Sequence, residues 1–194
     1  MPTRIGAAFC RALTIERTIM TIHEIFTTLA NRMVGAIMIH TQLAQLFAYV
    51  DLMPDARRQE SQLQEETHGY SELNKYYTQH HHSIVISDDP PQIDILNMGI
   101  LKKPNYELSP DDKVRIIKYG INEWVEWERQ SNIIYEDAYK NLIDISEVAT
   151  ADFVSRYVRD VDQELGDAER LYRVRDAIDW DLPTIYDKQA RFKK

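Results

Sequence analysis

The sequence predicts an all-α protein, an antiparallel four-helix bundle with one long crossover between its second and third helices. Three observations support this fold class. The chain of 194 residues has only six glycines and seven prolines, and most of them separate long stretches without helix breakers. Within those stretches apolar residues recur at steps of three and four, the period of an amphipathic helix. The connections run short, long, short, as in a bundle with one crossover.

The first expected helix covers about residues 21–53. Apolar side chains recur along it at helical spacing, and residues 33–50 carry no formal charge. Polar residues such as His40, Thr41 and Gln42 make a membrane span the weaker alternative. A helix that is apolar on more than one side packs on more than one neighbour. We therefore expect this helix to form core and also a subunit contact, so that the protein is at least a homodimer.

The second expected helix covers about residues 55–82 and is more polar. Residues 83–108 then form a connection that is interrupted by Pro90 and Pro91. This connection is too long to join neighbouring antiparallel helices directly. Its length suits a crossover that runs from one end of a bundle to the other.

The third expected helix begins at Ser109-Pro110-Asp111-Asp112 and runs to about Ile145. The serine caps exposed N–H groups, the proline is preset for a first turn, and the aspartates complement the helix dipole. We expect Thr150 to cap a fourth helix over about residues 151–180, which Pro183 ends before a short terminal helix.

Three segments follow from these boundaries. We expect an N-terminal arm over residues 1–19, the bundle over residues 20–182, and a C-terminal tail or short helix over residues 183–194. The apolar stretch of the arm is too short for a normal secretory signal, and a transit peptide is the less favoured alternative.

Composition narrows the function. A net charge of −8 and an isoelectric point near 5.2 argue against a dedicated nucleic-acid-binding protein. The single cysteine, Cys10, excludes an intramolecular disulfide framework and a zinc site with several thiolates. A reducing cytoplasm is the simplest compartment for such a chain.

Glu65 and His68 form the most informative motif. Residues three apart lie on one face of a helix, so this carboxylate and imidazole could hold one metal ion. The same Glu-x-x-His spacing supplies ligands inside four-helix carboxylate bundles. Glu128 adds a carboxylate on the expected inner stripe of the third helix, close in sequence to Trp124 and Tyr135. For each of these residues a solvated or ion-paired structural role is the alternative.

Residues 20–180 resemble the ferritin-like superfamily, which includes ferritins and bacterioferritins. The resemblance is carried by four sequence elements in the four expected helices. They are Leu29-Ala30-Asn31, Glu65-x-x-His68, Trp127-Glu128 and Phe153-Val154. The resemblance implies a cytoplasmic homo-oligomer that binds metal ions, with two irons held by carboxylates and imidazole, and that oxidises or stores iron.

Two helices depart from the family pattern. Arg32 or Met33 stands where the first helix should supply a glutamate, so we consider His40, nearly two turns later, as a replacement ligand. In the fourth helix Asp162 matches one alignment and Glu164 another, while Val161 occupies a position that should bind metal. The expected ligand set is therefore Glu65, His68 and Glu128, with Asp162 or Glu164 and with His40.

Two other functions remain open at this stage. The chain could be a non-catalytic ferritin-like bundle with a degenerate metal site, acting in assembly or interaction, since Arg32 and Val161 replace expected ligands. A small DNA-protecting ferritin relative is disfavoured by the acidic charge and by the lack of a lysine-rich N-terminal tail.

Overall fold

A computed structural model describes residues 20–191, without the side chains of Ile100 and of residues 189–191; the expected arm over residues 1–19 lies outside the described part. The described part contains α-helices and short 3-10 turns, and no strands. The helices are α1 (Ile22–Tyr49), α2 (Met53–His81), α3 (Pro110–Asp144), α4 (Val148–Asp176) and α5 (Leu182–Arg191), and the turns are Gly99–Lys102 and Asn105–Glu107.

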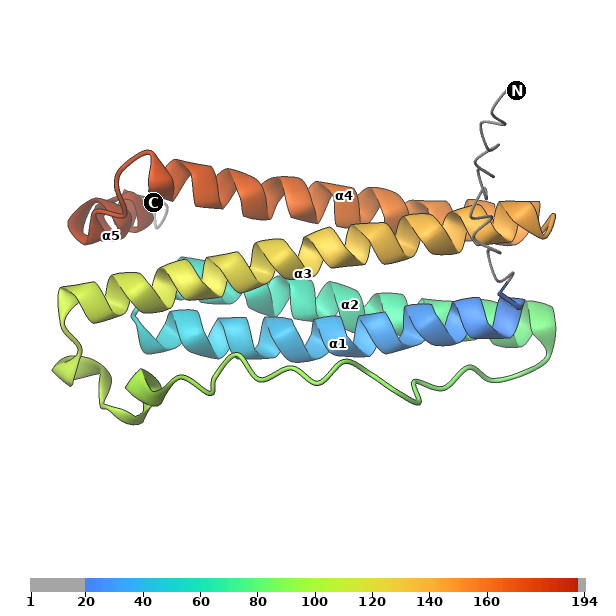
Figure 1. The fold of residues 1–194 in the computed structure, drawn as a ribbon, viewed down its shortest axis with the longest axis horizontal. Coiled ribbons are helices and arrows are strands. Elements are labelled where there is room, and N and C mark those ends of the chain that lie inside the picture. The colour runs from blue at the N-terminus through green and yellow to red at the C-terminus, as the bar shows by residue number, and fades with distance from the viewer. Residues whose placement is uncertain (1–19, 192–194) are drawn as a thin grey trace, which may run out of the picture.

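The four long helices form an antiparallel bundle, which confirms the expected fold class. Helices α1 and α2 make one hairpin, and α3 and α4 make the other (Figure 1). The crossover between α2 and α3 runs along α1 from one end of the molecule to the other, and α5 folds back beside the end of α4. The two hairpins meet mainly through α1 and α3.

Local sequence explains where α1 and α3 begin. Thr21 and Ser109 each cap a helix, and each forms a capping box with an acidic residue three positions later. The start expected at Ser109 is therefore confirmed. The cap expected at Thr150 is wrong: α4 begins earlier, at Val148, and the Thr150 hydroxyl donates to the carboxylate of Glu147 at 3.2 Å.

The fourth helix also ends earlier than expected. It stops at Asp176, and Asp179 and Trp180 adopt positive φ angles of 51° and 55° just beyond it. This left-handed backbone turns the chain back before Pro183, which lies in the first turn of α5 rather than at the end of α4. The expected short terminal helix is thus present, with a different start.

Polar residues of α1 hold the crossover against it. The Gln42 amide donates to the carbonyl of Ile93 and accepts from the backbone N–H of Ile95, both at 2.8 Å. The Asn31 side chain accepts from the Ser87 hydroxyl at 2.8 Å. These contacts explain why α1 carries amide side chains among apolar ones. Among the described helices, none is long and apolar enough to cross a membrane.

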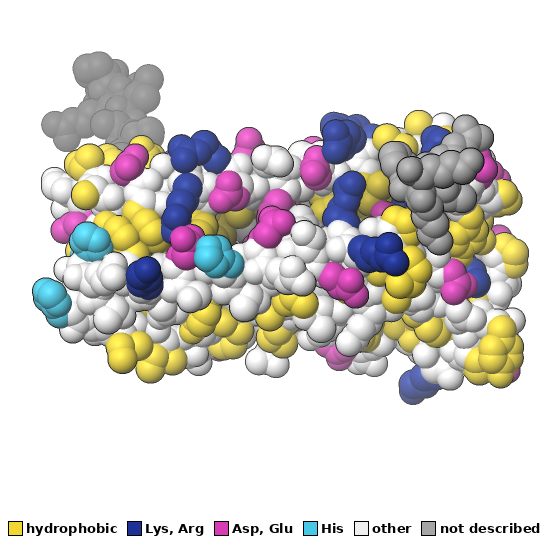
Figure 2. Space-filling view, turned by 180° about the vertical axis from the view of Figure 1, so that it is seen from behind, with side chains coloured by type: hydrophobic (Ala, Val, Ile, Leu, Met, Phe, Trp, Pro, Cys, Tyr) yellow, Lys and Arg dark blue, Asp and Glu magenta, His cyan; other side chains and the backbone are white. Residues whose placement is uncertain are grey.

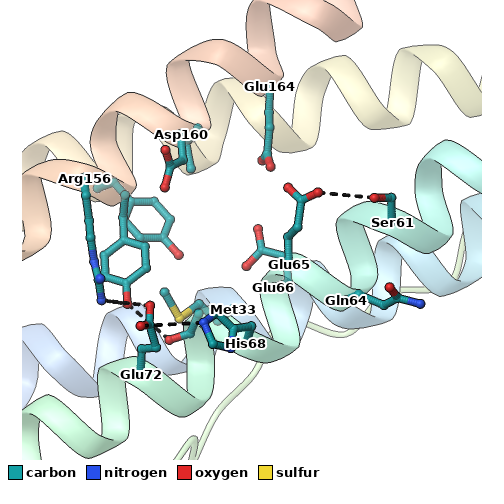
Figure 3. Close-up of a pocket in the computed structure, with 14 residues that line it drawn as sticks. Met33, Ser61, Gln64, Glu65, Glu66, His68, Glu72, Arg156, Asp160 and Glu164 are labelled. Atoms are coloured by element: carbon teal, nitrogen blue, oxygen red, sulfur yellow. Dashed lines mark hydrogen bonds and ion pairs between the residues drawn. The ribbon is translucent and has the colours of Figure 1, made fainter.

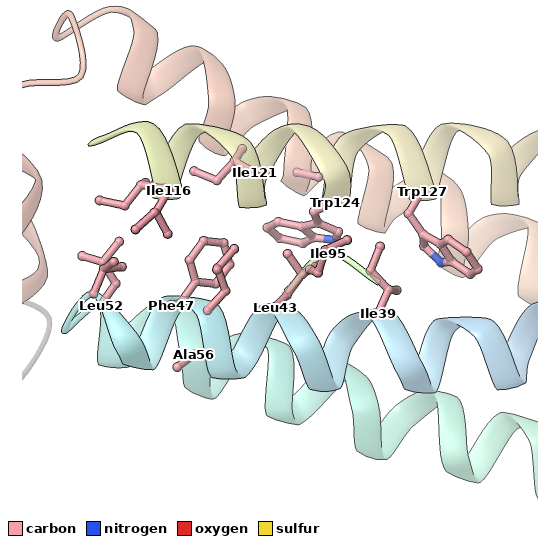
Figure 4. Close-up of a cluster of buried hydrophobic side chains, with 14 of the residues drawn as sticks. Ile39, Leu43, Phe47, Leu52, Ala56, Ile95, Ile116, Ile121, Trp124 and Trp127 are labelled. Atoms are coloured by element: carbon pink, nitrogen blue, oxygen red, sulfur yellow. The ribbon is translucent and has the colours of Figure 1, made fainter. Parts of the chain in front are cut away.

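The core has two apolar clusters separated by a polar layer. One cluster, around Phe47 and Trp124, lies between α1 and α3 (Figure 4). The other surrounds Phe26 and Tyr77. Glu128 belongs to a group of buried polar residues that includes Arg32 and His40. Such groups are costly to bury in the middle of a bundle, which makes this layer the candidate functional site.

Candidate metal site

The polar layer opens into a cavity between α2 and α4. The cavity has a volume of about 540 Å³ and contains more carboxyl groups than basic groups. Glu65 and Glu66 of α2 point across it toward Asp160 and Glu164 of α4 (Figure 3). Four acidic side chains from two helices therefore share one hollow.

Side-chain contacts join α2 and α4 on both sides of this cavity. On one side Arg156 forms an ion pair with Glu72 at 3.1 Å, and the Tyr157 hydroxyl donates to the carbonyl of Gly69 at 3.2 Å. On the other side Arg175 donates to Asp55 in a buried ion pair. The two helices are thus joined on either side of the cavity and separated where their carboxylates face each other.

Burial raises the pKa of three carboxyl groups, one from each of three helices. The pKa of Glu66 rises from 4.5 to about 7, mainly through burial, with Arg32 opposing the rise. Burial is also the main cause of the raised pKa values of Glu128 and Glu164, and neighbouring glutamates raise both further. The buried Oε2 of Glu164 has no hydrogen-bond partner among the described residues. Burial and the like charges of neighbouring carboxyls thus favour the protonated forms of these groups, and a positive charge placed among them would favour the ionised forms.

Glu128 lies at the back of the layer and is 1% exposed. The indole N–H of Trp124 donates to its Oε1 at 3.1 Å, and His40 Nε2 lies 3.5 Å from the same oxygen. Burial lowers the pKa of His40 to about 4, so this imidazole is neutral near pH 7. We assign the His40 proton to Nδ1, which then donates to Gln59 Oε1 at 2.7 Å and leaves the Nε2 lone pair facing Glu128.

Arg32 contributes a buried positive charge to this acidic layer. Its Nε donates to the Ser131 hydroxyl at 2.8 Å, another guanidinium nitrogen donates to the carbonyl of Trp127, and the group lies 3.2 Å from the centre of the Trp127 ring. These contacts direct the guanidinium along α3, so that it acts on Glu66 and Glu128 through its charge. An ion-paired role was the alternative for Glu128, and Arg32 is the buried basic residue nearest to that role, but its hydrogen bonds go to Ser131 and Trp127.

The Glu-x-x-His motif faces the cavity less directly than expected. Glu65 is exposed at the mouth of the cavity and accepts from the Ser61 hydroxyl at 3.3 Å. The His68 side chain is 76% exposed, and its Nε2 lies 3.6 Å from Glu72. The expectation that Glu65 and His68 converge with Glu128 in a dry interior is therefore wrong, because α2 is turned so that Glu66 and Gly69 face inward.

Glu66 was missed by the sequence reasoning, although a signal for it exists. The buried residues Gln62, Gly69, Leu73 and Tyr77 recur every three or four positions along α2, and Glu66 is the member of that series between Gln62 and Gly69. The Glu65-x-x-His68 motif favoured the neighbouring residue, Glu65, as the inward-facing carboxylate.

In α4 the structure separates the two candidate residues. Asp162 is exposed and points away from the bundle, whereas Glu164 lines the cavity. Val161 is buried beside Glu164. The alignment that placed Glu164 at the site agrees with this geometry, and the alignment that placed Asp162 there does not.

The side chains are not arranged as a closed coordination shell. Over residues 20–191 no three His, Cys, Asp or Glu side chains lie close enough together to hold a metal ion as they stand. Any ion that binds here must therefore draw carboxylates from α2 and α4 toward each other.

Comparison with solved structures defines the fold. Three archaeal ferritin structures align with 88% of this chain and with 93% of each of their own. They are an open pore ferritin from Archaeoglobus fulgidus (14% identity, TM-score 0.67), an engineered closed form of that protein (14%, 0.67) and a humanized archaeal ferritin (15%, 0.70). The fold is ferritin-like. No family model and no curated protein matches the sequence. The similarity to ferritins is therefore a similarity of fold.

Proposed function

We propose that this ferritin-like protein binds a divalent metal ion, iron(II) foremost, in the cavity between α2 and α4. The observation that carries the proposal is the group of carboxyls, Glu65, Glu66, Asp160 and Glu164, that face each other across the cavity. The raised pKa of Glu66 and the unpartnered Oε2 of Glu164 support it. A cation would replace the protons and offset the repulsion between these groups.

The available donors define the kind of ion. Carboxylate oxygens suit hard ions such as Mn²⁺, Mg²⁺ and Fe²⁺, whereas zinc sites favour nitrogen and sulfur donors. The His68 imidazole lines the cavity only at its mouth, where the side chain is 76% exposed. The residues therefore fit an ion held by carboxylates. They fit the expected pair of irons held by carboxylates and imidazole less well, since Arg32 occupies the α1 side of the layer and His68 is exposed.

Iron(II) would be the cargo of this site. Anionic oxygen ligands favour the higher charge of iron(III), so an ion held here would also be easier to oxidise. We propose iron binding first. Oxygen consumption on addition of iron(II) would show that the protein also oxidises the iron it binds. We also propose that the protein assembles at least as a homodimer, which its mass in solution would test.

Metal titration tests the proposal directly. Mn²⁺ binding to the metal-free protein can be followed by electron paramagnetic resonance, and Fe²⁺ binding by anaerobic titration. We expect one ion per chain near neutral pH. Replacing both Glu66 and Glu164 by glutamine should weaken binding at least tenfold, because two charged donors are lost while shape is kept. His68→Ala is the control and should leave affinity within about twofold, since His68 is exposed.

Two results would contradict the proposal. One is less than a tenth of an equivalent of Fe²⁺ or Mn²⁺ bound at millimolar concentration. The other is unchanged affinity in the double glutamine variant, which would place the ion elsewhere.

The second candidate function is a bundle that kept the fold without the metal site. Arg32 favours it, because a guanidinium in the layer repels cations and its contacts with Ser131 and Trp127 hold it in place. Such a protein would act in assembly or interaction. Elemental analysis of the protein from its own host, together with its mass in solution, would separate the two candidates.

A further inference from the structure

A second cavity lies at the end of the molecule where α5 packs. Its volume is about 460 Å³, and it is bounded by the start of α2, the end of α4 and α5. Its apolar lining residues are Pro54, Leu171, Val174, Ile178 and Ile185. None of its lining residues belongs to the acidic cavity described above.

Basic side chains surround this apolar floor. Arg58, Arg170, Arg175 and Lys188 line the cavity together with two aspartates. Arg170 pairs with Asp167 at 2.8 Å, and Arg175 pairs with Asp55, so Arg58 and Lys188 give the cavity a positive excess. Figure 2 shows Lys and Arg side chains beside hydrophobic ones at this end of the molecule. This excess contrasts with the net charge of −8 of the whole chain.

Arg175 is a buried basic residue of this cavity. The residue is 5% exposed, and only part of its guanidinium is used by Asp55. Its Nη1 is buried and has no hydrogen-bond partner among the described residues. The guanidinium of Arg175 therefore adds positive charge beneath the cavity lining without offering Nη1 as a contact to a ligand.

We propose that this cavity binds a small amphipathic anion, a carboxylate or phosphate attached to an unbranched apolar body. The apolar body would pack on Leu171, Val174 and Ile185, and the anionic head would accept from the exposed side chains of Arg58 and Lys188. A volume of about 460 Å³ lies within the usual range for small-molecule sites and is too small for a folded protein segment. The mixed lining, apolar with a few converging donors, is also typical of such sites.

The charge pattern excludes the other simple ligand classes. A cationic amphiphile would meet Arg58 and Lys188 at close range, and a neutral one would leave the charges of these two residues without a counter-charge. The proposed anion site and the acidic cavity share no lining residue, so variants of one can be tested separately from variants of the other.

Calorimetry with a matched series of ligands tests the proposal on the full-length protein. Decanoate, decyl phosphate, decanol and decyltrimethylammonium have the same apolar chain and different head groups. We expect decanoate or decyl phosphate to bind at one per chain with a Kd of about 100 μM, an ordinary ligand efficiency for such a molecule. Decanol and the cation should bind at least tenfold more weakly. The tighter of the two anions identifies the head group.

A double variant tests the location. Arg58→Gln with Lys188→Gln removes two exposed charges that line the cavity and should weaken decanoate at least tenfold. Arg115→Gln with Lys140→Gln removes the same charge from exposed positions of α3 and should leave affinity unchanged. Glu66→Gln should also have no effect, which keeps this result independent of the metal proposal. Circular dichroism would verify that each variant is folded.

Three outcomes would overturn the inference. Decanol that binds as tightly as decanoate would show an apolar cavity without an anion site. An equal loss in the two double variants would show nonspecific attraction by net charge. Binding of several decanoates per chain would show surface adsorption of a detergent.

Discussion

Replacing Glu66 by glutamine should make the metal-free protein more stable near neutral pH. Burial raises the pKa of this carboxyl from 4.5 to about 7. The folded state therefore keeps a proton that the unfolded chain releases above pH 4.5. Because the folded state binds more protons, the contribution of Glu66 to the free energy of unfolding falls as pH rises from 4.5 to 7 and then levels off. Glutamine keeps the shape of the protonated carboxyl and removes this loss.

The size of the effect follows from the same pKa values. A difference between 4.5 and about 7 corresponds to about 3 kcal/mol, since one pKa unit is worth about 1.4 kcal/mol. Water in the open cavity screens part of the charge, so we expect a gain of about 2 kcal/mol at about pH 8. Near pH 4.5 the variant and the natural protein should have nearly equal stability.

Urea unfolding followed by tryptophan fluorescence, with a chelator present, would measure this difference at several pH values. Glu65→Gln is the matched control, because Glu65 is the exposed neighbour of Glu66 on the same helix. Its effect should stay within about 0.5 kcal/mol at every pH. A difference between Glu66→Gln and the natural protein that does not change with pH would refute the reasoning. An equal gain from Glu65→Gln would refute it as well.

Two further predictions concern packing and buried charge. Asp55→Asn should cost about 3–5 kcal/mol in chemical denaturation, because it leaves the guanidinium of Arg175 buried without its counter-charge; a loss below about 1 kcal/mol would contradict this. Gly120→Ala should lower stability by about 1 kcal/mol in spite of better helix propensity, because its Cβ would lie 2.7 Å from Leu46. Gly166→Ala, with open space around it, should raise stability by about 1 kcal/mol, and the same sign for both glycines would contradict the packing argument.

Most of the fold could be predicted because the helix signals are local. Ser109 and Pro110 mark the start of α3, and the prolines of the crossover mark where no helix runs. The boundaries of α4 were harder to predict. Threonine is a favoured N-cap residue, so Thr150 looked like the start, whereas no residue pattern marked the actual start at Val148. The end of α4 depends on positive φ angles at Asp179 and Trp180, and neither residue type announces such a turn strongly.

The site was predicted less well, because it depends on how far each helix is rotated about its axis. Glu128 and His40 were expected to face inward, and both are buried. Glu65 and Glu66 point in directions that differ by 100° around the helix axis. A small error in the expected rotation of α2 therefore exchanges which of the two glutamates faces inward, and places Glu65 and His68 at the surface. The rotation is set by contacts that join distant segments, such as the one between Tyr157 and the carbonyl of Gly69.

The protons on the buried carboxyls connect stability to the proposed metal binding. An ion that enters the cavity must displace the proton of Glu66 below about pH 7, so its affinity should fall as the solution becomes more acidic. Arg32 opposes the effect of burial on Glu66, because its positive charge lowers the pKa of that carboxyl. Arg32 therefore has two effects: its charge repels a cation, and it favours the ionised form of Glu66 that would bind the cation. A metal-binding bundle should therefore show affinity that rises with pH toward about 8, whereas a bundle without a metal site should show only the pH-dependent loss of stability.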